Sequence, residues 1–319
     1  MNARPSKGAA EGPLDVYLSS PRGFCAGVVR AVDIVEIALQ RFGPPIYVKH
    51  QIVHNPHVVA SLEAKGAVTV EDVDEIPEGA HVVFSAHGSA PDDFAKARRR
   101  GLRVIDATCP LVTRVHNEAK KYEREGKKLI LIGHRGHQEV RGTMGQADMH
   151  LMDDRERDGL PGWQPETEIA VLTQTTLSVD DTARVVKEIR GRFPNAMVRN
   201  DICYATTNRQ ESAKLMARQV DVVLVIGAQN SSNCRRLQEV ARAEGVTAYL
   251  INGPAELDPG WLSGVERVGI TSGASTPEDM VQAVIEAINP DRVIPIGEQE
   301  EDIQFVLPRE LRDHSPLPG

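Results

Sequence analysis

The stretch Val104-Ile-Asp-Ala-Thr-Cys109-Pro110 joins a short apolar run, typical of a β-strand, to a cysteine at the expected start of a helix. The same local pattern recurs in Val16-Tyr-Leu-Ser-Ser-Pro-Arg-Gly-Phe-Cys25 and in Val198-Arg-Asn-Asp-Ile-Cys203. A helix N-terminus carries unpaired N–H groups and the positive end of the helix dipole, which favour a thiolate over a thiol. Because thiolates bind metals, the pattern predicts three similar units that share one metal site.

Polar residues follow each cysteine at matched places. One set comes 28 or 29 residues after the cysteine and a second set follows a further strand: His54, His137 and Ser231, then His87, Thr175 and Ser275. In open parallel sheets, ligands bind outside the carboxyl ends of the strands, where all of these residues are expected. The repeat therefore predicts three units around a pseudo-threefold axis, with the cysteines and a ring of donors at one central cavity.

Apolar runs of strand length alternate with helical patterns along most of the chain. Runs such as Lys128–Ile132 and Val222–Gly227 are continuous Val/Ile/Leu stretches, which suits parallel strands buried on both faces. The alternation predicts an α/β protein with mostly parallel sheets. The expected parts are a flexible N-terminal extension, three α/β domains and a C-terminal tail: residues 1–13, 14–109, 110–200, 201–289 and 290–319.

The bulk composition narrows the function classes. The chain has 319 residues, so two or three domains are expected. Its net charge of −8 argues against a general binder of nucleic acids or membrane surfaces. No apolar run approaches the roughly 20 residues of a membrane span, and no secretory signal is apparent. Four cysteines without a CxxC pair favour a reducing cytoplasm over a disulfide framework.

Three thiolates without a fourth cysteine nearby leave one metal position open, which marks a catalytic rather than a closed structural site. Thiolates select zinc or iron–sulfur clusters. Cys234 has no counterpart in the repeat and is interpreted as a bystander. The chain has neither a phosphate-binding P-loop sequence nor a convincing dinucleotide fingerprint, so electrons would have to come from a partner protein.

The remaining candidates suit an anionic substrate. His54 and His87 each follow an expected strand and precede a proline suited to the first helical turn. Such loops direct N–H donors at an anion. In Gly133-His-Arg-Gly-His-Gln-Glu139, the final carboxyl could be held protonated in a closed site and transfer a proton. Small hydroxyl and amide donors at strand ends complete a lining suited to phosphate oxygens: Thr175, Ser231, Ser232, Asn233 and Ser275.

These residues stand in long motifs that resemble the IspH/LytB family of 4-hydroxy-3-methylbut-2-enyl diphosphate reductases. The most specific stretches are Pro21-Arg-Gly-Phe-Cys-Ala-Gly-Val, Asp106-Ala-Thr-Cys-Pro, Gly133-His-Arg-Gly-His-Gln-Glu, Thr173-Gln-Thr-Thr-Leu-Ser-Val-Asp-Asp, Asp201-Ile-Cys-Tyr-Ala-Thr-Thr-Asn-Arg-Gln and Ser231-Ser-Asn. The resemblance covers nearly the whole chain, from about Val16 to the tail around Phe305–Leu311.

The resemblance implies a function and a role for each candidate. It implies a central [4Fe-4S] cluster held by Cys25, Cys109 and Cys203, with a fourth iron that binds the allylic hydroxyl. Two electrons and two protons would then remove the oxygen as water. Glu139 would deliver a proton and Thr175 would bond near the hydroxyl. The remaining residues would bind the diphosphate: His54, His87, His137, Ser231, Ser232, Asn233 and Ser275.

Electrons are expected from a protein of the ferredoxin or flavodoxin type. Two alternatives remain open from the residues alone. One is a zinc hydrolase of a phosphorylated substrate that uses the same three cysteines. The other is a non-enzymatic iron–sulfur sensor, although this acidic chain shows no DNA-binding module.

Overall fold

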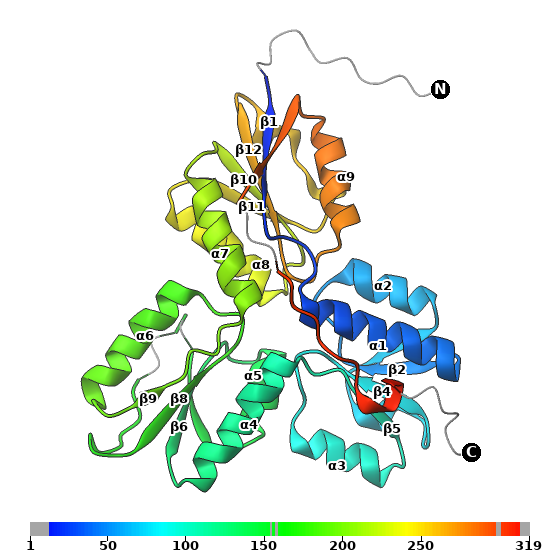
Figure 1. Ribbon diagram of the computed structural model, residues 1–319, viewed down its shortest axis with the longest axis vertical. Helices are drawn as coiled ribbons and strands as arrows, with labels where there is room; N and C mark the ends of the chain where they lie inside the picture. The colour runs from blue at the N-terminus through cyan, green and yellow to red at the C-terminus, as the bar shows by residue number, and fades with distance from the viewer. Residues whose placement is uncertain (1–12, 154, 157–158, 298–300, 313–319) are drawn as a thin grey trace. The chain divides into compact units, whose positions relative to one another are not determined.

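Three parallel β-sheets flanked by helices form the fold, which confirms the predicted α/β class (Figure 1). The computed structural model describes residues 13–153, 155–156, 159–297 and 301–312. The predicted N-terminal extension lies outside this part of the chain, apart from residue 13. No helix among the described residues combines the length and the apolar character needed to cross a membrane.

The strands are β1 (Asp15–Ser19), β2 (Ile46–Lys49), β3 (Ala67–Val70), β4 (His81–Phe84), β5 (Arg103–Asp106), β6 (Lys128–Ile132), β7 (Met149–Met152), β8 (Ile169–Thr173), β9 (Met197–Val198), β10 (Val222–Ile226), β11 (Thr247–Ile251), β12 (Arg267–Ser272) and β13 (Arg292–Ile296). The helices are α1 (Ala26–Phe42), α2 (Pro56–Ala64), α3 (Pro91–Arg99), α4 (Pro110–Arg124), α5 (Gln138–Met144), α6 (Val179–Arg192), α7 (Tyr204–Ala217), α8 (Ser232–Ala243), α9 (Glu278–Ile288) and α10 (Arg309–Arg312).

The strand order repeats from sheet to sheet. The orders are β3-β2-β4-β5, β7-β6-β8-β9 and β11-β10-β12-β1-β13, and all neighbouring strands run parallel. In each sheet, the first strand after a cysteine lies between the second and the third. The fourth place belongs to a strand that leads to a cysteine: β5 to Cys109, β9 to Cys203 and β1 to Cys25. The repeat read from the sequence is therefore present in the strand order.

Two strands lie in a different sheet from the one that the predicted ranges imply. β1 was placed with the first domain, but it pairs in parallel with β12 and β13 of the third sheet. β13 was assigned to a tail outside the repeat, and it covers the other edge of β1. Unpaired N–H and C=O groups at a strand edge favour such pairing. The division into three domains itself stays a prediction.

The chain forms two compact units. One contains residues 1–24 and 207–301, hence the third sheet, and the other contains residues 25–206 and 302–319, hence the first two sheets. All three predicted cysteine ligands belong to the second unit.

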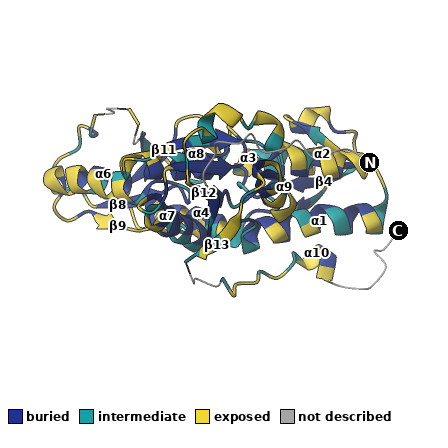
Figure 2. Cartoon of the chain, turned by 90° about the horizontal axis from the view of Figure 1, so that it is seen from above, coloured by how far each residue is buried: buried dark blue, intermediate teal, exposed yellow. Residues whose placement is uncertain are grey.

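Continuous apolar strands make the cores. Every residue of β8 and β10 is buried, as their Val/Ile/Leu sequences predict. Helices contribute one apolar face each, for example Ala31, Ile34 and Val35 of α1, while their other faces are exposed (Figure 2). The loops that follow the strands carry the residues of interest, because the carboxyl ends of parallel strands meet at one edge of a sheet.

Candidate functional site

Each of the three predicted cysteine ligands stands at a helix start. Cys25 is the N-cap of α1, Cys109 is the N-cap of α4, and Cys203 directly precedes α7. As whole residues all three are partly exposed, although the thiols of Cys109 and Cys203 are largely shielded from water, and none forms a disulfide. The strand–cysteine–helix pattern predicted from the sequence is therefore confirmed at all three positions.

The first turn of α1 brings two of the thiols to a common space. A Cβ atom added at Gly27 would lie 2.8 Å from Sγ of Cys109 and 3.8 Å from Sγ of Cys25. A separation of 2.8 Å is closer than two such atoms can pack, so only glycine fits at this position. The charge of Cys25 also acts on Cys203, which places the third thiol in the same electrostatic environment. The three thiols therefore lie near one another, and that they hold one metal group stays a prediction.

Burial works against ionisation of these thiols. It raises the pKa of Cys109 to about 12 and that of Cys203 to about 11, and the neighbouring cysteines raise both further. Backbone N–H groups at the helix starts lower both pKa values, but less than burial raises them. The expectation that a helix N-terminus yields thiolates is therefore wrong for these two residues in the absence of a metal. A cation that replaces their protons is needed to hold three thiolates together.

This donor set suits a soft metal centre. Thiolates select zinc or iron–sulfur clusters over hard ions, and the missing side chain of Gly27 keeps the first turn of α1 clear of the Cys25 and Cys109 sulfurs. Among the described residues, no three His, Cys, Asp or Glu side chains converge closely enough to hold a single metal ion.

Three histidines from different loops meet in the same unit. The ring centroids of His54 and His87 lie 4.0 Å apart in a stacked arrangement, and His137 lies edge-on at 5.3 and 6.1 Å from them. His54 follows β2, His87 follows β4, and His137 is the N-cap of α5. The sequence placed these residues at equivalent strand ends, and the fold brings them together.

The histidines are held in the neutral form. Burial lowers the pKa of His54 to about 4 and that of His137 to about 3, and it lowers the pKa of His87 well below the ordinary value. Proximity to His54 lowers the pKa values of His87 and His137 further. Within the described residues, Nε2 of His137 is buried and has no hydrogen-bond partner. Neutral imidazoles can donate N–H groups to an anion, whose charge would raise their pKa values again.

Glu139 is a buried carboxyl with a raised pKa. Its side chain is 3 % exposed. Its two carboxyl oxygens accept hydrogen bonds from the backbone N–H of Thr175 at 2.7 Å and from the Thr175 hydroxyl at 2.9 Å. Burial raises the pKa of Glu139 to about 7 against the effect of these two hydrogen bonds. The carboxyl can therefore carry a proton near neutral pH, as the sequence predicted for a closed site.

Thr175 joins this carboxyl to the cysteines. The carbonyl oxygen of Thr175 accepts a hydrogen bond of 3.0 Å from the N–H of Cys203. One residue thus fixes both a predicted metal ligand and the predicted proton donor. The interval between the cysteine and the threonine in sequence gave no indication of this contact.

Two further residues of the site were not identified from the sequence. Asp201 is buried, accepts the N–H of Thr173 at 3.2 Å, and its charge raises the pKa of Glu139. Arg30 is 9 % exposed and donates to the carbonyl oxygens of Ala107 at 3.2 Å and Thr108 at 3.1 Å, just before Cys109. A cation within the apolar face of α1 is the signal that could have revealed Arg30.

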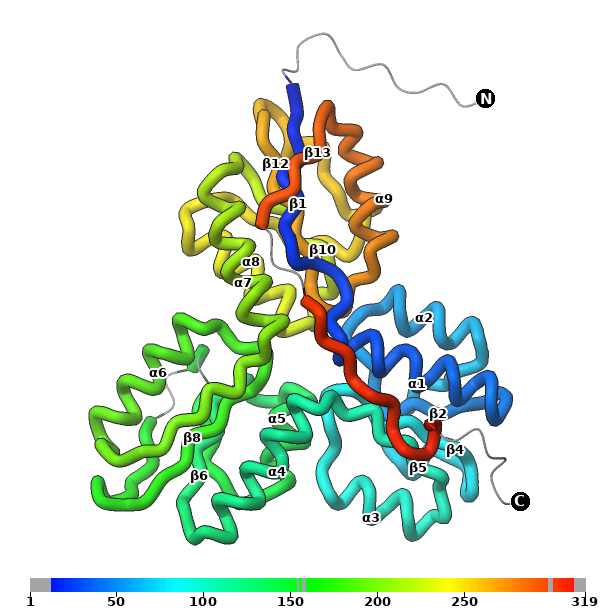
Figure 3. The backbone as a smooth tube through the Cα atoms, viewed as in Figure 1, coloured from blue at the N-terminus to red at the C-terminus, as the bar shows by residue number. Residues whose placement is uncertain are grey.

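Arg30 also reaches the C-terminal segment. Its Nε donates to the carbonyl oxygen of Val306 at 2.8 Å, and this segment follows α1 along the same unit (Figure 3). The guanidinium lies near Cys109, whose charge acts on it. Arg30 therefore connects the helix that begins at Cys25, the loop that carries Cys109, and the C-terminal segment.

The other predicted substrate-binding residues belong to the other compact unit. Ser231 is the N-cap of α8 and accepts the N–H of Cys234 at 3.4 Å, while Ser232 and Asn233 form the first turn of this helix. Ser275 follows β12. All four are buried, and among the described residues both amide atoms of Asn233 lack a hydrogen-bond partner. That they share one lining with the histidines stays a prediction.

Cys234 is fully buried in this unit and packs against the backbone of two glycines. A Cβ added at Gly227 or Gly273 would lie 2.3 or 2.2 Å from its Sγ. This packing is consistent with the interpretation of Cys234 as a bystander that takes no part in the metal site.

Comparisons with known proteins show which family this chain resembles. The family model described as "LytB protein" matches residues 16–289. The chain is 51 % identical to 4-hydroxy-3-methylbut-2-enyl diphosphate reductase 1 of Rhodopseudomonas palustris, over 93 % of this chain and 99 % of the relative. It is 52 % identical to the 4-hydroxy-3-methylbut-2-enyl diphosphate reductase of Mycolicibacterium paratuberculosis, over 93 % of this chain and 92 % of the relative.

A solved structure is similar along almost the whole chain. It is that of the E-1-hydroxy-2-methyl-but-2-enyl-4-diphosphate reductase from Plasmodium falciparum, with a TM-score of 0.90 and 36 % identity. The match covers 94 % of this chain and 97 % of that structure. The sequence motifs, the grouped thiols and these matches lead to one conclusion: the chain belongs to the LytB protein family.

Proposed function

We propose that this chain reduces 4-hydroxy-3-methylbut-2-enyl diphosphate to isopentenyl and dimethylallyl diphosphates, the last step of the methylerythritol phosphate (non-mevalonate) route to isoprenoids. Relatives that share about half of the sequence over nearly the full length are reductases of this substrate by name. The structural observation that carries the proposal is the position of Thr175, which binds both Glu139 and the backbone of Cys203. It sets a protonated acid beside a thiol group suited to a redox centre. The names of these relatives support reduction and neither of the two alternatives, hydrolysis and sensing.

The family is one of iron–sulfur reductases, and we propose that Cys25, Cys109 and Cys203 hold a [4Fe-4S] cluster. When bound, such a group supplies electrons one at a time and a Lewis-acidic iron with an open position. The protein contributes three helix starts that fix the sulfurs and a glycine that leaves space beside them. The buried thiols lose their protons when the metal binds, so cluster assembly is coupled to proton release.

The diphosphate would be bound by His54, His87 and His137 together with the four residues at the start of α8 and after β12: Ser231, Ser232, Asn233 and Ser275. The histidines are neutral without an anion, since burial lowers their pKa values. A bound diphosphate reverses this preference and draws protons onto the rings. The buried polar atoms of His137 and Asn233 that lack partners among the described residues would then be satisfied.

Glu139 would supply the proton that leaves with the hydroxyl oxygen as water. Removal of the hydroxyl consumes two electrons and two protons, and one proton must reach the departing oxygen. With a pKa of about 7 the carboxyl is protonated on the acid side of neutrality, and a nearby diphosphate would raise this pKa further. The Thr175 hydroxyl, bonded to the carboxyl at 2.9 Å, orients it and offers a second polar group to the substrate oxygen.

The electron donor and the cellular compartment are part of the same proposal. The two electrons would come from a small redox protein of the ferredoxin or flavodoxin type. The enzyme would work in the cytoplasm, where three free thiols can remain reduced.

An anaerobic preparation tests the proposal. We expect a brown protein that contains iron and acid-labile sulfide and that converts the allylic diphosphate when given a chemical reductant. A preparation without iron and sulfide, or a loaded protein without turnover, would overturn the proposed function.

The role of Glu139 is tested by Glu139→Gln, which preserves the shape of the side chain and can still bond to both Thr175 groups. We expect substrate binding close to that of the wild type and turnover reduced at least a hundredfold, in line with the usual contribution of a general acid of ~10²–10⁴. Glu188→Gln on α6 is a matched control because its carboxyl is not among the predicted site residues. Near-normal turnover of Glu139→Gln would remove this residue from the role of proton donor.

A further inference from the structure

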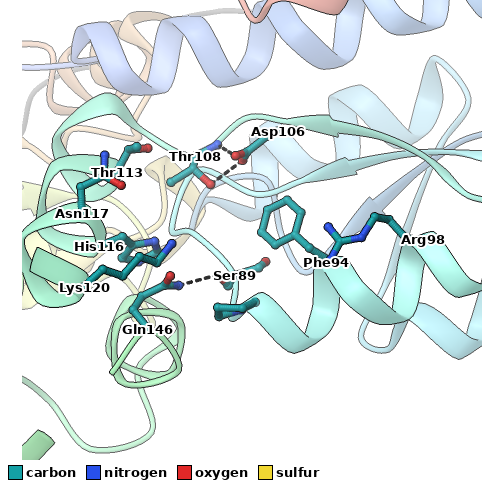
Figure 4. A pocket seen from close by; sticks show the side chains of 11 residues that line it. Ser89, Phe94, Arg98, Asp106, Thr108, Thr113, His116, Asn117, Lys120 and Gln146 are labelled. Atoms are coloured by element: carbon teal, nitrogen blue, oxygen red, sulfur yellow. Dashed lines mark hydrogen bonds between the residues drawn. The ribbon is translucent and has the colours of Figure 1, made fainter. Parts of the chain in front are cut away.

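A second cavity lies in the unit that carries the cysteines, apart from the residues assigned to the cluster or the substrate. Its volume is about 310 Å³, which is within the range of small-molecule pockets. Residues of α3, α4, the loop after β5 and the turn after α5 line it (Figure 4). The lining is Ser89, Pro91, Phe94, Arg98, Asp106, Thr108, Thr113, His116, Asn117, Lys120 and Gln146.

Two buried polar side chains at this cavity lack partners. Ser89 is 4 % exposed and His116 is 7 % exposed. Among the described residues, neither Oγ of Ser89 nor Nε2 of His116 has a hydrogen-bond partner. Buried polar atoms are nearly always satisfied, by protein, by ordered water or by a ligand. Their presence at the wall indicates that something polar occupies the cavity.

Other polar groups of the wall are engaged and hold it in shape. Thr108 donates both its N–H and its hydroxyl to the Asp106 carboxylate, and the Gln146 amide donates to the carbonyl oxygen of Ser89 at 3.2 Å (Figure 4). The cavity is thus formed by fixed residues before any ligand binds.

The charge of the lining favours an anion. Arg98 and Lys120 are cationic, and within the described part of the chain neither forms an ion pair. Asp106 is the one acidic residue of the lining, and Thr108 already binds its carboxylate. His116 is neutral because burial lowers its pKa to about 4. Two cations against one engaged carboxylate leave the cavity with an excess of positive charge.

The layout of the cavity also favours a ligand with an organic body. Lys120 and His116 lie on one side of the cavity, and the Phe94 ring and Arg98 lie on the other (Figure 4). An anionic group at Lys120 therefore leaves a planar or apolar part of the same molecule against Phe94. Lys120 and the Asn117 amide on α4 together suit the several oxygens of a phosphate group better than a single carboxylate. The Thr113 hydroxyl already donates to the carbonyl oxygen of Cys109 at 3.3 Å.

We propose that this cavity is a second ligand site, which binds a small organic phosphate with its phosphate group at Lys120 and its body against Phe94. The site is independent of the proposed reductase chemistry. It adjoins the residues proposed for that chemistry, however, because His116 packs against Gly88, the neighbour of His87, and Thr108 directly precedes Cys109. A bound molecule would contact the backbone that carries a predicted substrate ligand and a predicted cluster ligand.

Binding of phenyl phosphate to the anaerobically purified holoenzyme, measured by calorimetry, tests the proposal. We expect saturable binding that weakens at least tenfold in Lys120→Ala and less in Arg98→Ala, because Arg98 lies on the side of the phenyl ring. The matched controls Arg99→Ala and Lys121→Ala change the adjacent exposed cations, which are not in the lining, and should leave the affinity unchanged. Phenyl phosphate should also bind more tightly than inorganic phosphate or benzoate.

Three results would overturn the proposal. The first is the absence of saturable binding, in which case water alone occupies the cavity. The second is binding that is lost in His54→Ala and retained in Lys120→Ala, which would place the probe at the predicted substrate site. The third is equal weakening in all four cation variants, which would indicate general charge attraction. None of these outcomes depends on turnover, so failure here is distinguishable from failure of the proposed reductase function.

Discussion

Replacement of Arg30 by alanine should loosen the connection between the cysteine loops. The guanidinium donates to two buried carbonyl oxygens, of Ala107 and Thr108, and to a partly buried one, of Val306. A hydrogen bond that involves a charged group contributes about 1.5–3 kcal/mol. Counting only the two buried bonds at the lower value, the variant should lose about 3 kcal/mol of unfolding free energy. That corresponds to more than a hundredfold in the folding equilibrium, since about 1.4 kcal/mol is a factor of ten.

Urea unfolding of Arg30→Ala and iron content after anaerobic purification measure this effect. We expect a lower denaturation midpoint and a lower iron content, because Thr108 directly precedes Cys109. Arg30→Lys should recover only part of the loss, since one ammonium cannot bond to carbonyl groups in the fixed fork geometry of a guanidinium.

Arg41→Ala is the matched control for Arg30→Ala. Arg41 lies at the other end of α1 and donates to the carbonyl oxygen of Glu310 at 3.0 Å, but in an exposed setting. Its loss should lower the unfolding free energy by less than about 1 kcal/mol. If Arg30→Ala loses no more stability and no more iron than Arg41→Ala, the buried hydrogen bonds of Arg30 do not stabilise the loop before Cys109, and the reasoning is refuted.

Three further predictions concern pH, the cysteines and a glycine. Burial raises the pKa of Glu139 from 4.5 to about 7. Because the carboxyl loses its proton above this pH, turnover should fall about tenfold per pH unit above pH 7. A flat rate profile up to pH 8 would contradict this. For the same reason, folded Glu139 keeps a proton that the unfolded chain releases between about pH 4.5 and about pH 7. The free energy of unfolding of the wild type, relative to that of Glu139→Gln, should therefore decline as the pH rises through this range. Urea unfolding at several pH values measures this difference. Cys203→Ala should lose its iron, whereas Cys234→Ala should retain it and lose only about 1 kcal/mol of stability; equal iron contents would argue against the assigned ligands. Gly88→Ala should lower the melting temperature, because the backbone of Gly88 has φ +82° and a Cβ would lie 2.7 Å from Cε1 of His116. An unchanged melting temperature would show that the His116 ring moves aside without loss of stability.

Local patterns in the sequence predicted the elements that depend on neighbouring residues. The Val/Ile/Leu runs are strands, three of the cysteines stand at helix starts, and β6 has the predicted bounds Lys128–Ile132, because strand periodicity and turn residues act over short distances. The short strands β3, β7 and β9 were not predicted. They are only two to four residues long, too short for a clear strand pattern, so their existence depends on pairing with a neighbour in the sheet.

Pairing across the chain could not be read from the pattern. β1 begins the chain and looks like the first strand of the first domain, yet it occupies the fourth place of the third sheet. The repeat explains why β1 lies in the third sheet, because in each sheet the fourth place belongs to the strand that leads to a cysteine. For the third sheet, the strand that fills this place comes from the opposite end of the chain.

The sequence by itself determined the α/β class, the threefold repeat and the identity of the chemical groups, because spacing and residue type are local properties. Only the tertiary structure decided how those groups behave. It buries Cys109 and Cys203, so their thiols keep their protons despite the helix starts, and it lowers the pKa values of the three histidines. It also places Glu139 against Thr175 and a buried Arg30 beside Cys109. Desolvation and charge proximity depend on what surrounds a group in space, and residues distant in sequence supply those surroundings.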